Sequence, residues 1–187
     1  TAEMLEEKLP AGCHVAPLYG GLDAKAQDAA IRPAAGDDRK IVLASAIAQT
    51  SLTIEGVRVV IDSGLARVPK YEPQTGLTRL ETVRVSRASA DQRRGRAGRT
   101  EPGVCYRLWD EAQTAALPQA EAPEILEADL TGLVVDLAAW GSFDPAGLAF
   151  ADPPPQAAWS EAKALLQDLH AIDADGRLTA DGKALAR

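Results

Sequence analysis

The sequence has few of the features that define disulfide-rich, metal-binding or membrane proteins. Of its 187 residues only two are cysteines, Cys13 and Cys105, which lie far apart with no partner at metal-ligand spacing. No apolar run approaches the roughly 18 residues that a membrane-spanning helix needs, and the first residues show no basic and then apolar signal pattern. We therefore expect a cytoplasmic protein with no metal site of its own, in which both cysteines are buried as small apolar side chains.

Internal repeats and low-complexity tracts are also absent. The remaining composition is that of a globular protein, with 46% hydrophobic and 25% charged residues. A chain of this length can form one large domain, or one medium domain and one small one. It begins inside an amphipathic segment in which Met4, Leu5 and Leu9 recur at helical spacing. We therefore expect the first domain to be N-terminally incomplete, with a preceding segment in a longer protein.

Charge is distributed unevenly along the chain, although the net charge is −7. Residues 1–109 carry 16 basic and 13 acidic side chains, whereas residues 110–187 carry 4 and 14. Within the basic part, residues 79–107 hold eight arginines and only three acidic residues. Because salt screens charge repulsion beyond about 8–10 Å, such a local basic surface can bind phosphate even in an acidic protein.

Short apolar segments separated by helix-sized connections dominate residues 1–112. Continuous apolar runs predict buried strands at residues 14–19, 41–44 and 57–61, and residues 22–31 predict a helix. This pattern is typical of an α/β fold with a parallel sheet covered by helices on both faces. Residues 67–71 and 77–85 alternate instead around the turn EPQTG, which indicates a projecting β-hairpin.

After Trp109 the pattern becomes mostly helical. Leucines and a valine between residues 126 and 137 form one helical stripe, and residues 159–169 form another beyond the proline-rich FADPPP segment. The segment IDADGRLTADGKALA predicts a strand, an Asp-Gly turn, a strand and a short helix. We therefore predict a winged-helix-like domain over residues 113–187.

The most informative segment is SADQRRGRAGRT at residues 89–100. On one continuous helix starting near Ser89, Gln92, Arg96 and Arg99 are spaced i, i+4, i+7 and share a face. Guanidinium groups match the planar, multivalent charge of a phosphoryl group, and arginines offered to a nucleotide can stabilise charge during phosphoryl transfer. Gly95 and Gly98 lower helix propensity, which suggests that another group approaches this face closely.

Other roles for these side chains are open. Ser89 and Gln92 also fit a capping box, in which Gln92 would bind the helix's own backbone. Arg93 and Arg94, which lie off the shared face, are expected on a solvated or packing surface. Asp62 follows a parallel strand at the edge where ligands bind, but it could equally organise the Asp-Ser-Gly turn.

Three segments carry a family resemblance. QRRGRAGR at 92–99, LASAIAQTSLTIEGVRVVIDSG at 43–64 and APLYGGL at 16–22 resemble, in order and spacing, the second RecA-like domain of superfamily 2 DEAH-box ATP-dependent helicases. The pattern is most similar to the HrpB-type bacterial branch. The resemblance covers residues 5–140 and continues weakly through a winged-helix region. It implies the C-terminal half of the motor of an RNA or DNA helicase, with RNA favoured.

The resemblance also implies residue roles. Gln92 would lie near the attacking water, with Arg96 and Arg99 as arginine fingers at the γ-phosphate of ATP. The hairpin would guide or separate nucleic-acid strands. The expected nucleotide contacts are Thr53, Glu55 and Asp62. The hydroxyls expected to contact the nucleic-acid backbone are Ser45, Thr50 and Ser51.

This chain departs from the family pattern at several positions. It has Ser45-Ala46 where the family usually has Thr-Asn, and Gln49 where the family has Glu. Ile31 and Arg32 stand where many members place an aromatic residue against adenine. The phosphate-binding pattern GxxxxGK[ST] and the Asp-Glu-Ala-His motif are both absent from the 187 residues. ATP and Mg²⁺ would therefore need a first RecA-like domain in cis, and the chain alone should be inactive.

A noncatalytic alternative also fits some of these features. The basic residues 79–107 could serve as a phosphate-binding surface of a nucleic-acid-binding module, with the winged helix as reader. The strongly acidic residues 110–187 argue against a groove-reading module. The Gln92, Arg96 and Arg99 grouping, which backbone binding alone would not require, favours the motor.

Overall fold

The computed structural model describes residues 2–50, 54–72, 75–99 and 101–186. The chain forms two compact units. One unit joins Thr1–Val68 to Thr82–Glu121, and the other joins Pro69–Glu81 to Ala122–Arg187. Residues 113–121 group with the first unit, and the division at residue 112 stays a prediction.

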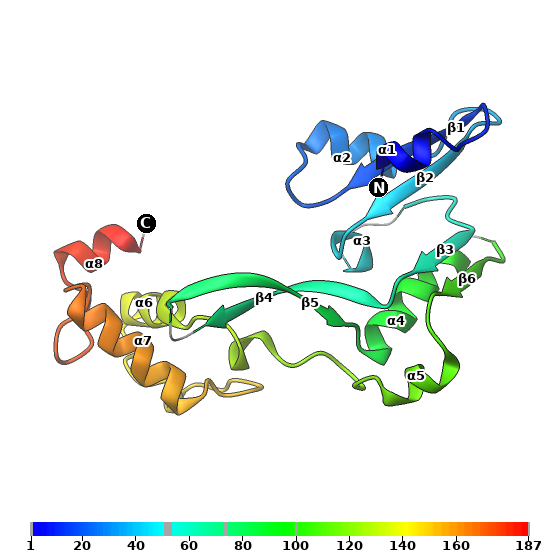
Figure 1. Ribbon diagram of the computed structural model, residues 1–187. Coiled ribbons are helices and arrows are strands. Elements are labelled where there is room, and N and C mark those ends of the chain that lie inside the picture. The colour runs from blue at the N-terminus through cyan, green and yellow to red at the C-terminus, as the bar shows by residue number, and fades with distance from the viewer. Residues whose placement is uncertain (1, 51–53, 73–74, 100, 187) are drawn as a thin grey trace. The chain divides into compact units, whose positions relative to one another are not determined.

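The first unit opens with a parallel strand pair and two helices. Strand β1 (Cys13–Leu18) pairs in parallel with β2 (Arg39–Ala44), so that Cys13 lies beside Arg39 and Leu18 beside Ala44. Helices α1 (Ala2–Glu6) and α2 (Ala24–Ile31) both contact β1 (Figure 1). This strand–helix–strand order is the right-handed building unit of parallel α/β proteins.

Helix α2 is fixed by polar groups at both ends. Its N-cap is Asp23, whose carboxylate accepts a hydrogen bond from the Ala26 amide at 2.8 Å. At the other end the Lys40 ammonium on β2 donates to the carbonyl oxygens of Ala30, at 2.7 Å, and Arg32. Lys40 thereby joins the carboxyl end of α2 to the neighbouring strand.

A second parallel pair lies in the same unit. Strand β3 (Val59–Asp62) pairs with β6 (Val104–Arg107), and helix α4 (Arg87–Arg94) contacts β3 (Figure 1). Short helices α3 (Ile47–Thr50) and α5 (Glu111–Ala116) complete the unit. The predicted mixed α/β fold with parallel strands is confirmed, and within the described residues these strands form two separate pairs.

The predicted hairpin is present as β4 (Leu65–Glu72) and β5 (Leu77–Arg84). The two strands begin and end within a residue or two of the alternating segments. Across them Lys70 pairs with Glu81 at 3.0 Å. The chain reverses just before β5 at Gly76, whose φ of +66° lies in the left-handed region that glycine adopts without strain.

Helices α6 (Thr131–Trp140), α7 (Gln156–Asp168) and α8 (Ala180–Leu185) form the second unit with two 3₁₀ turns, η2 (Glu124–Leu126) and η3 (Pro145–Gly147). Leu126 of the predicted stripe lies in η2, outside α6, because the helix begins only at Thr131. The buried core is made of Leu130, Val134, Val135, Leu137, Trp159, Ala162, Leu166, Ala171 and Ile172.

A small wing connects α7 to α8. Ile172 and Leu178 form an antiparallel bridge, and Gly182 of α8 packs so closely that an added Cβ would lie 1.9 Å from the Ala171 carbonyl oxygen. The two strands predicted for this wing are thus reduced to a single bridge, whereas the short helix predicted after them is present as α8. In the parts of the chain that the structure describes, no helix is both long and apolar enough to span a membrane.

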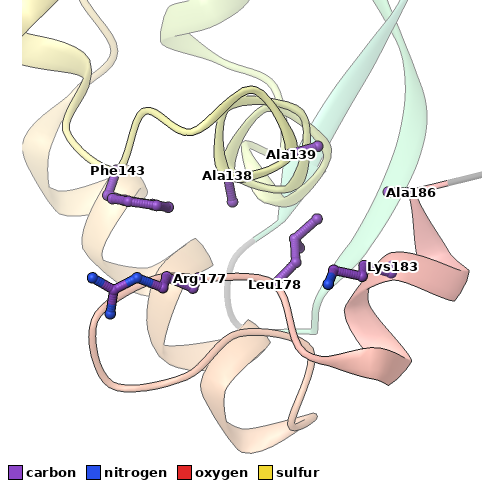
Figure 2. Close-up of a pocket in the computed structure, with 7 residues that line it drawn as sticks. All are labelled: Ala138, Ala139, Phe143, Arg177, Leu178, Lys183 and Ala186. Carbon is purple, nitrogen blue, oxygen red and sulfur yellow. The ribbon is translucent and has the colours of Figure 1, made fainter.

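The wing borders a hollow of about 410 Å³ (Figure 2). The hollow is lined mainly by apolar side chains and by two cations, Arg177 and Lys183. The Arg177 guanidinium is 5.8 Å from the centre of the Phe143 ring, a cation–π distance, and also pairs with Asp175.

Candidate functional site

The arginine-rich segment begins with a capped helix. Helix α4 starts at Arg87, and its N-cap is Ser86, whose hydroxyl oxygen accepts a hydrogen bond from the Ser89 amide at 3.0 Å. The capping box considered for Ser89 and Gln92 is therefore wrong, because the helix begins before Ser89. Gln92 lies in the last turn of α4 with an exposed side chain.

The segment changes helix type at its first glycine. Helix α4 ends at Arg94, and Gly95–Gly98 form the 3₁₀ helix η1. The prediction of one continuous α-helix is therefore wrong, because the segment ends in a 3₁₀ helix with three residues per turn. Arg96 and Arg99 lie one such turn apart, and the shared face of Gln92, Arg96 and Arg99 stays a prediction.

Arg96 and Arg99 are close enough to influence one another. Partial burial, and then the positive charge of Arg99, lower the pKa of the Arg96 guanidinium, which nevertheless stays charged at neutral pH. Arg99 is exposed, whereas Arg96 is half-buried. Two neighbouring guanidiniums match the charge of an anion with more than one negative oxygen.

Backbone packing fixes the position of η1. A Cβ added to Gly103, just before β6, would lie 1.4 Å from the carbonyl oxygen of Ala97 in η1. Only glycine allows this approach. By contrast, a Cβ at Gly95 or Gly98 would meet no atom of the described residues within 4 Å. No described residue therefore fills the space beside these two glycines.

Arg93 is part of a buried ion pair. Its Nη1 lies 2.9 Å from Asp62 Oδ1, with side-chain exposures of 17% and 1%, and also donates to the Leu65 carbonyl at 3.1 Å. The same Asp62 oxygen accepts a hydrogen bond from the Gly64 amide at 2.9 Å. Of the two roles considered for Asp62, the geometry favours that of organising the turn, and Arg93 lies on a packing surface and not in solvent.

Gln49 connects α3 to the arginine-rich segment. Its Oε1 accepts from Arg93 Nε at 3.1 Å, and its Nε2 donates to the Ser89 hydroxyl oxygen and lies 3.5 Å from Gln92 Oε1. Its backbone carbonyl accepts from Arg96 Nη2. One residue thus binds three residues of α4 and one of η1.

Glu121 approaches α4 from the segment that follows α5. The amides of Arg87 and Ala88 donate to the carbonyls of Pro118 and Gln119, at 2.8 and 3.1 Å, which places Glu121 beside the N-terminus of the helix. Partial burial raises the pKa of the Glu121 carboxyl, but hydrogen bonds from the Ser89 and Ser86 hydroxyls and from backbone amides together lower it below its ordinary value. Glu121 is therefore an anion at neutral pH.

The remaining predicted residues are distributed around α3. Ser45 is exposed directly after β2, and its amide donates to the Leu18 carbonyl at 3.0 Å, which extends the strand pair by one residue. Glu55 is exposed as well. Ser51 and Thr53 lie outside the described residues, as does the side chain of Thr50. Of the segment between β2 and β3, hydrogen bonds are therefore described here for Ser45 and Gln49.

Sequence reasoning noted Gln49 only as a departure from the family and did not consider Glu121. Gln49 is 40 residues from Ser89 and 44 from Arg93, so their contacts follow from tertiary structure alone. The available signal was a polar amide that directly follows the apolar residues Ile47 and Ala48. The cysteine prediction needs a correction too, because Cys13 and Cys105 are only partly buried.

The chain thus combines an α/β unit of parallel strand pairs, which carries the arginine-rich segment, with a helical unit that includes a small wing. The sequence pattern of the helicase conserved C-terminal domain matches residues 1–101, and that of the helicase associated domain (HA2), winged-helix, matches residues 164–187. The chain belongs to the helicase conserved C-terminal domain family, and to its DEAH-box, HrpB-type members.

Known proteins agree with this assignment. The chain is 46% identical over 184 residues to the ATP-dependent RNA helicase HrpB of Escherichia coli, covering 98% of this chain and 23% of that protein. It is 42% identical over 173 residues to the probable ATP-dependent RNA helicase DHX34 of mouse, covering 92% of this chain and 15% of that protein. The crystal structure of the E. coli DEAH/RHA helicase HrpB superposes with a TM-score of 0.90, over 98% of this chain and 23% of that one.

The chain spans about a quarter or less of the length of these relatives. It is thus similar to one part of each.

Proposed function

We propose that this chain supplies the C-terminal half of an ATP-driven helicase motor that acts on RNA. The relatives are named ATP-dependent RNA helicases, which supports ATP as the nucleotide and RNA over DNA as the nucleic acid. Residues 1–112 would act as the second RecA-like domain and residues 113–187 as the winged-helix domain. A cytoplasmic location stays a prediction.

The observation that carries this proposal is the placement of Arg96 and Arg99 on a rigid turn with open space beside it. Gly103 fixes η1 against β6, and Gly95 and Gly98 leave room that no described residue fills. In phosphoryl transfer, negative charge spreads over the oxygens of the transferred group, and positioned guanidiniums stabilise it. Arg96 and Arg99 would act as arginine fingers, and the exposed Gln92 amide would orient the attacking water.

Magnesium would be held elsewhere in the full-length protein. Among the residues that the structure describes, no three His, Cys, Asp or Glu side chains group in a way that could hold a metal ion. A first RecA-like domain in cis would supply the metal ligands and the remaining phosphate contacts, and this chain alone should not hydrolyse ATP.

The other predicted contacts belong to the segment between β2 and β3. Ser45, Thr50 and Ser51 would contact the nucleic-acid backbone, and Thr53 and Glu55 the nucleotide. Asp62 is buried against Arg93, so its contribution to nucleotide binding would be to hold the arginine-rich segment in place.

A noncatalytic nucleic-acid-binding module is the second candidate, supported by the eight arginines of residues 79–107. Several of these arginines, however, are engaged within the chain. Arg93 pairs with Asp62, and Arg107 pairs with Asp91 at 2.7 Å and lies over the Trp109 ring. The surface available for phosphate is thus smaller than the sequence indicates, which favours the motor.

The deciding experiment compares Arg96→Lys and Arg99→Lys in the full-length protein. Lysine keeps the charge but removes the planar fork, so ATP turnover should fall by about 10³-fold while RNA affinity falls only a few-fold. Arg94→Lys is the matched control, because the Arg94 side chain is 62% exposed and lies in the same segment. Equal loss of RNA binding in all three variants with intact turnover would favour the binding module.

A further inference from the structure

A tryptophan lies at the base of the β4–β5 hairpin. Trp109, two residues after β6, packs in a small core with Ala66 of β4 and with Val85, which directly follows β5. The same core contains Ala90 of α4. Val85 is 2% exposed, and its amide donates to the Gly64 carbonyl oxygen at 3.0 Å, which closes the hairpin at its base. The indole thus lies where the hairpin, α4 and the end of β6 meet.

The indole reaches the backbone at the start of the hairpin. A Cβ added to Gly64 would lie 2.8 Å from Cε3 and 3.1 Å from Cζ3 of Trp109. Gly64 also has a φ of +72°, a left-handed conformation that glycine adopts without strain. The Trp109 Nε1 donates to the Thr114 hydroxyl oxygen of α5 at 2.9 Å, which fixes the orientation of the ring.

Arg107 connects the same ring to α4. Its guanidinium lies 5.5 Å from the centre of the Trp109 ring, a cation–π distance. The same guanidinium donates through Nη2 to the Asp91 carboxylate at 2.7 Å. Asp91 lies in α4 and directly precedes Gln92. A continuous path of printed side-chain contacts therefore runs from the hairpin base at Gly64 through Trp109 and Arg107 to α4.

The arginine-bearing end of α4 has a second anchor that does not involve the indole. Arg93 is paired with Asp62 of β3 at 2.9 Å, in a largely buried contact. Removal of the indole would therefore leave α4 attached to β3, while the hairpin base would lose its packing against α4. The two ends of the path should thus respond unequally to substitution of Trp109.

We propose that Trp109 is a positioning residue that fixes the base of the β4–β5 hairpin to α4. The proposal rests on the proposed function, in which the hairpin would guide or separate RNA strands. A hairpin fixed at its base keeps its position when a duplex presses on it, whereas a hairpin with a loose base yields. The indole thereby keeps strand separation coupled to ATP turnover.

The test compares Trp109→Leu, Trp109→Phe and Trp140→Leu in the full-length protein. Trp109→Leu should lower the unwinding of an RNA duplex about tenfold and change RNA-stimulated ATP turnover by no more than about twofold. Trp109→Phe keeps an aromatic ring beside Gly64 and Arg107, so it should retain most of the unwinding. Trp140→Leu is the matched control, because Trp140 is 74% exposed on α6 and should leave both activities unchanged. Equal loss of unwinding and turnover in Trp109→Leu would overturn the proposal.

Amide hydrogen exchange over residues 64–68 and 82–86 tests the proposal without any motor activity. Exchange in these segments should be faster in Trp109→Leu than in the wild type and unchanged in Trp140→Leu. If the wild type does not unwind RNA, the proposed function fails, yet exchange still reports whether the indole fixes the hairpin base. Unchanged exchange in Trp109→Leu would overturn the proposal.

A second variant covers the case in which Trp109→Leu does not fold. Arg107→Met keeps the indole but removes both the cation beside it and the hydrogen bond to Asp91. It breaks the path at its next contact, so unwinding should fall while ATP turnover is retained. Unwinding equal to that of the wild type in Arg107→Met would contradict the proposal.

Discussion

The Arg93 guanidinium and the Asp62 carboxylate form a largely buried ion pair, with Nη1 2.9 Å from Oδ1. The pair joins α4 to the carboxyl end of β3, across 31 residues of sequence. A buried pair is costly to break from one side, because the remaining charge stays in a medium that solvates it poorly.

Asp62→Asn should therefore lower the free energy of unfolding by about 3 kcal/mol. The amide keeps an acceptor for Gly64 but leaves Arg93 without a countercharge. Urea denaturation measures the change. Asp175→Asn is the control, since Asp175 and its partner Arg177 are 71% and 60% exposed and the pair should contribute little. Equal effects of the two substitutions would contradict the burial argument.

Glycines on the two sides of η1 should respond oppositely to alanine. Gly103→Ala puts a Cβ against the Ala97 carbonyl, so η1 must move, and both the melting temperature and the ATP turnover of the full-length protein should fall. In Gly95→Ala the added Cβ would contact no described atom, and the φ of Gly95, −62°, suits alanine. The melting temperature of this variant should therefore stay the same or rise slightly. If a nucleotide occupies the space beside Gly95, turnover alone should fall in that variant.

Lys40→Met should loosen the carboxyl end of α2. The ammonium donates to the carbonyls of Ala30 and Arg32, and its loss leaves the last turn without a cation, at a cost of about 1 kcal/mol. A decrease of roughly 2–4 °C in melting temperature is expected for a protein of this size. Lys25→Met, on an exposed position of the same helix, should change it much less.

Glu121 should contribute stability that depends on pH. Hydrogen bonds hold its folded-state pKa below the unfolded value of about 4.3, so the contribution is complete above that value and is lost as pH falls through the folded-state pKa. Denaturation of the wild type between about pH 5 and pH 2 should thus show a steeper loss of stability than Glu121→Gln. Parallel curves would mean that the Ser86 and Ser89 hydroxyls do not hold the carboxylate.

Strand positions were predictable from sequence because parallel strands are often continuous apolar runs. The predicted burial was wrong, however, since Val59 and Ile61 of β3 are 55% and 68% exposed. Residues 14–19 and 41–44 match β1 and β2 within two residues. The arginine-rich segment was less predictable, since it changes to 3₁₀ geometry at Gly95 and packs against Gly103, which follows it in the sequence. Contacts of Gln49 and Arg93 join segments more than 30 residues apart, which neither spacing nor periodicity reveals.

The hairpin makes the two compact units discontinuous in sequence. Its outer residues, Pro69–Glu81, belong to the second compact unit, while the residues on either side, up to Val68 and from Thr82, belong to the first. The backbone thus crosses from one unit to the other three times, at 68/69, 81/82 and 121/122. A protease that cuts only near residue 121 would leave residues 69–81, which belong to the second unit, joined to the first. Separating the two units therefore requires excision or circular permutation and not truncation.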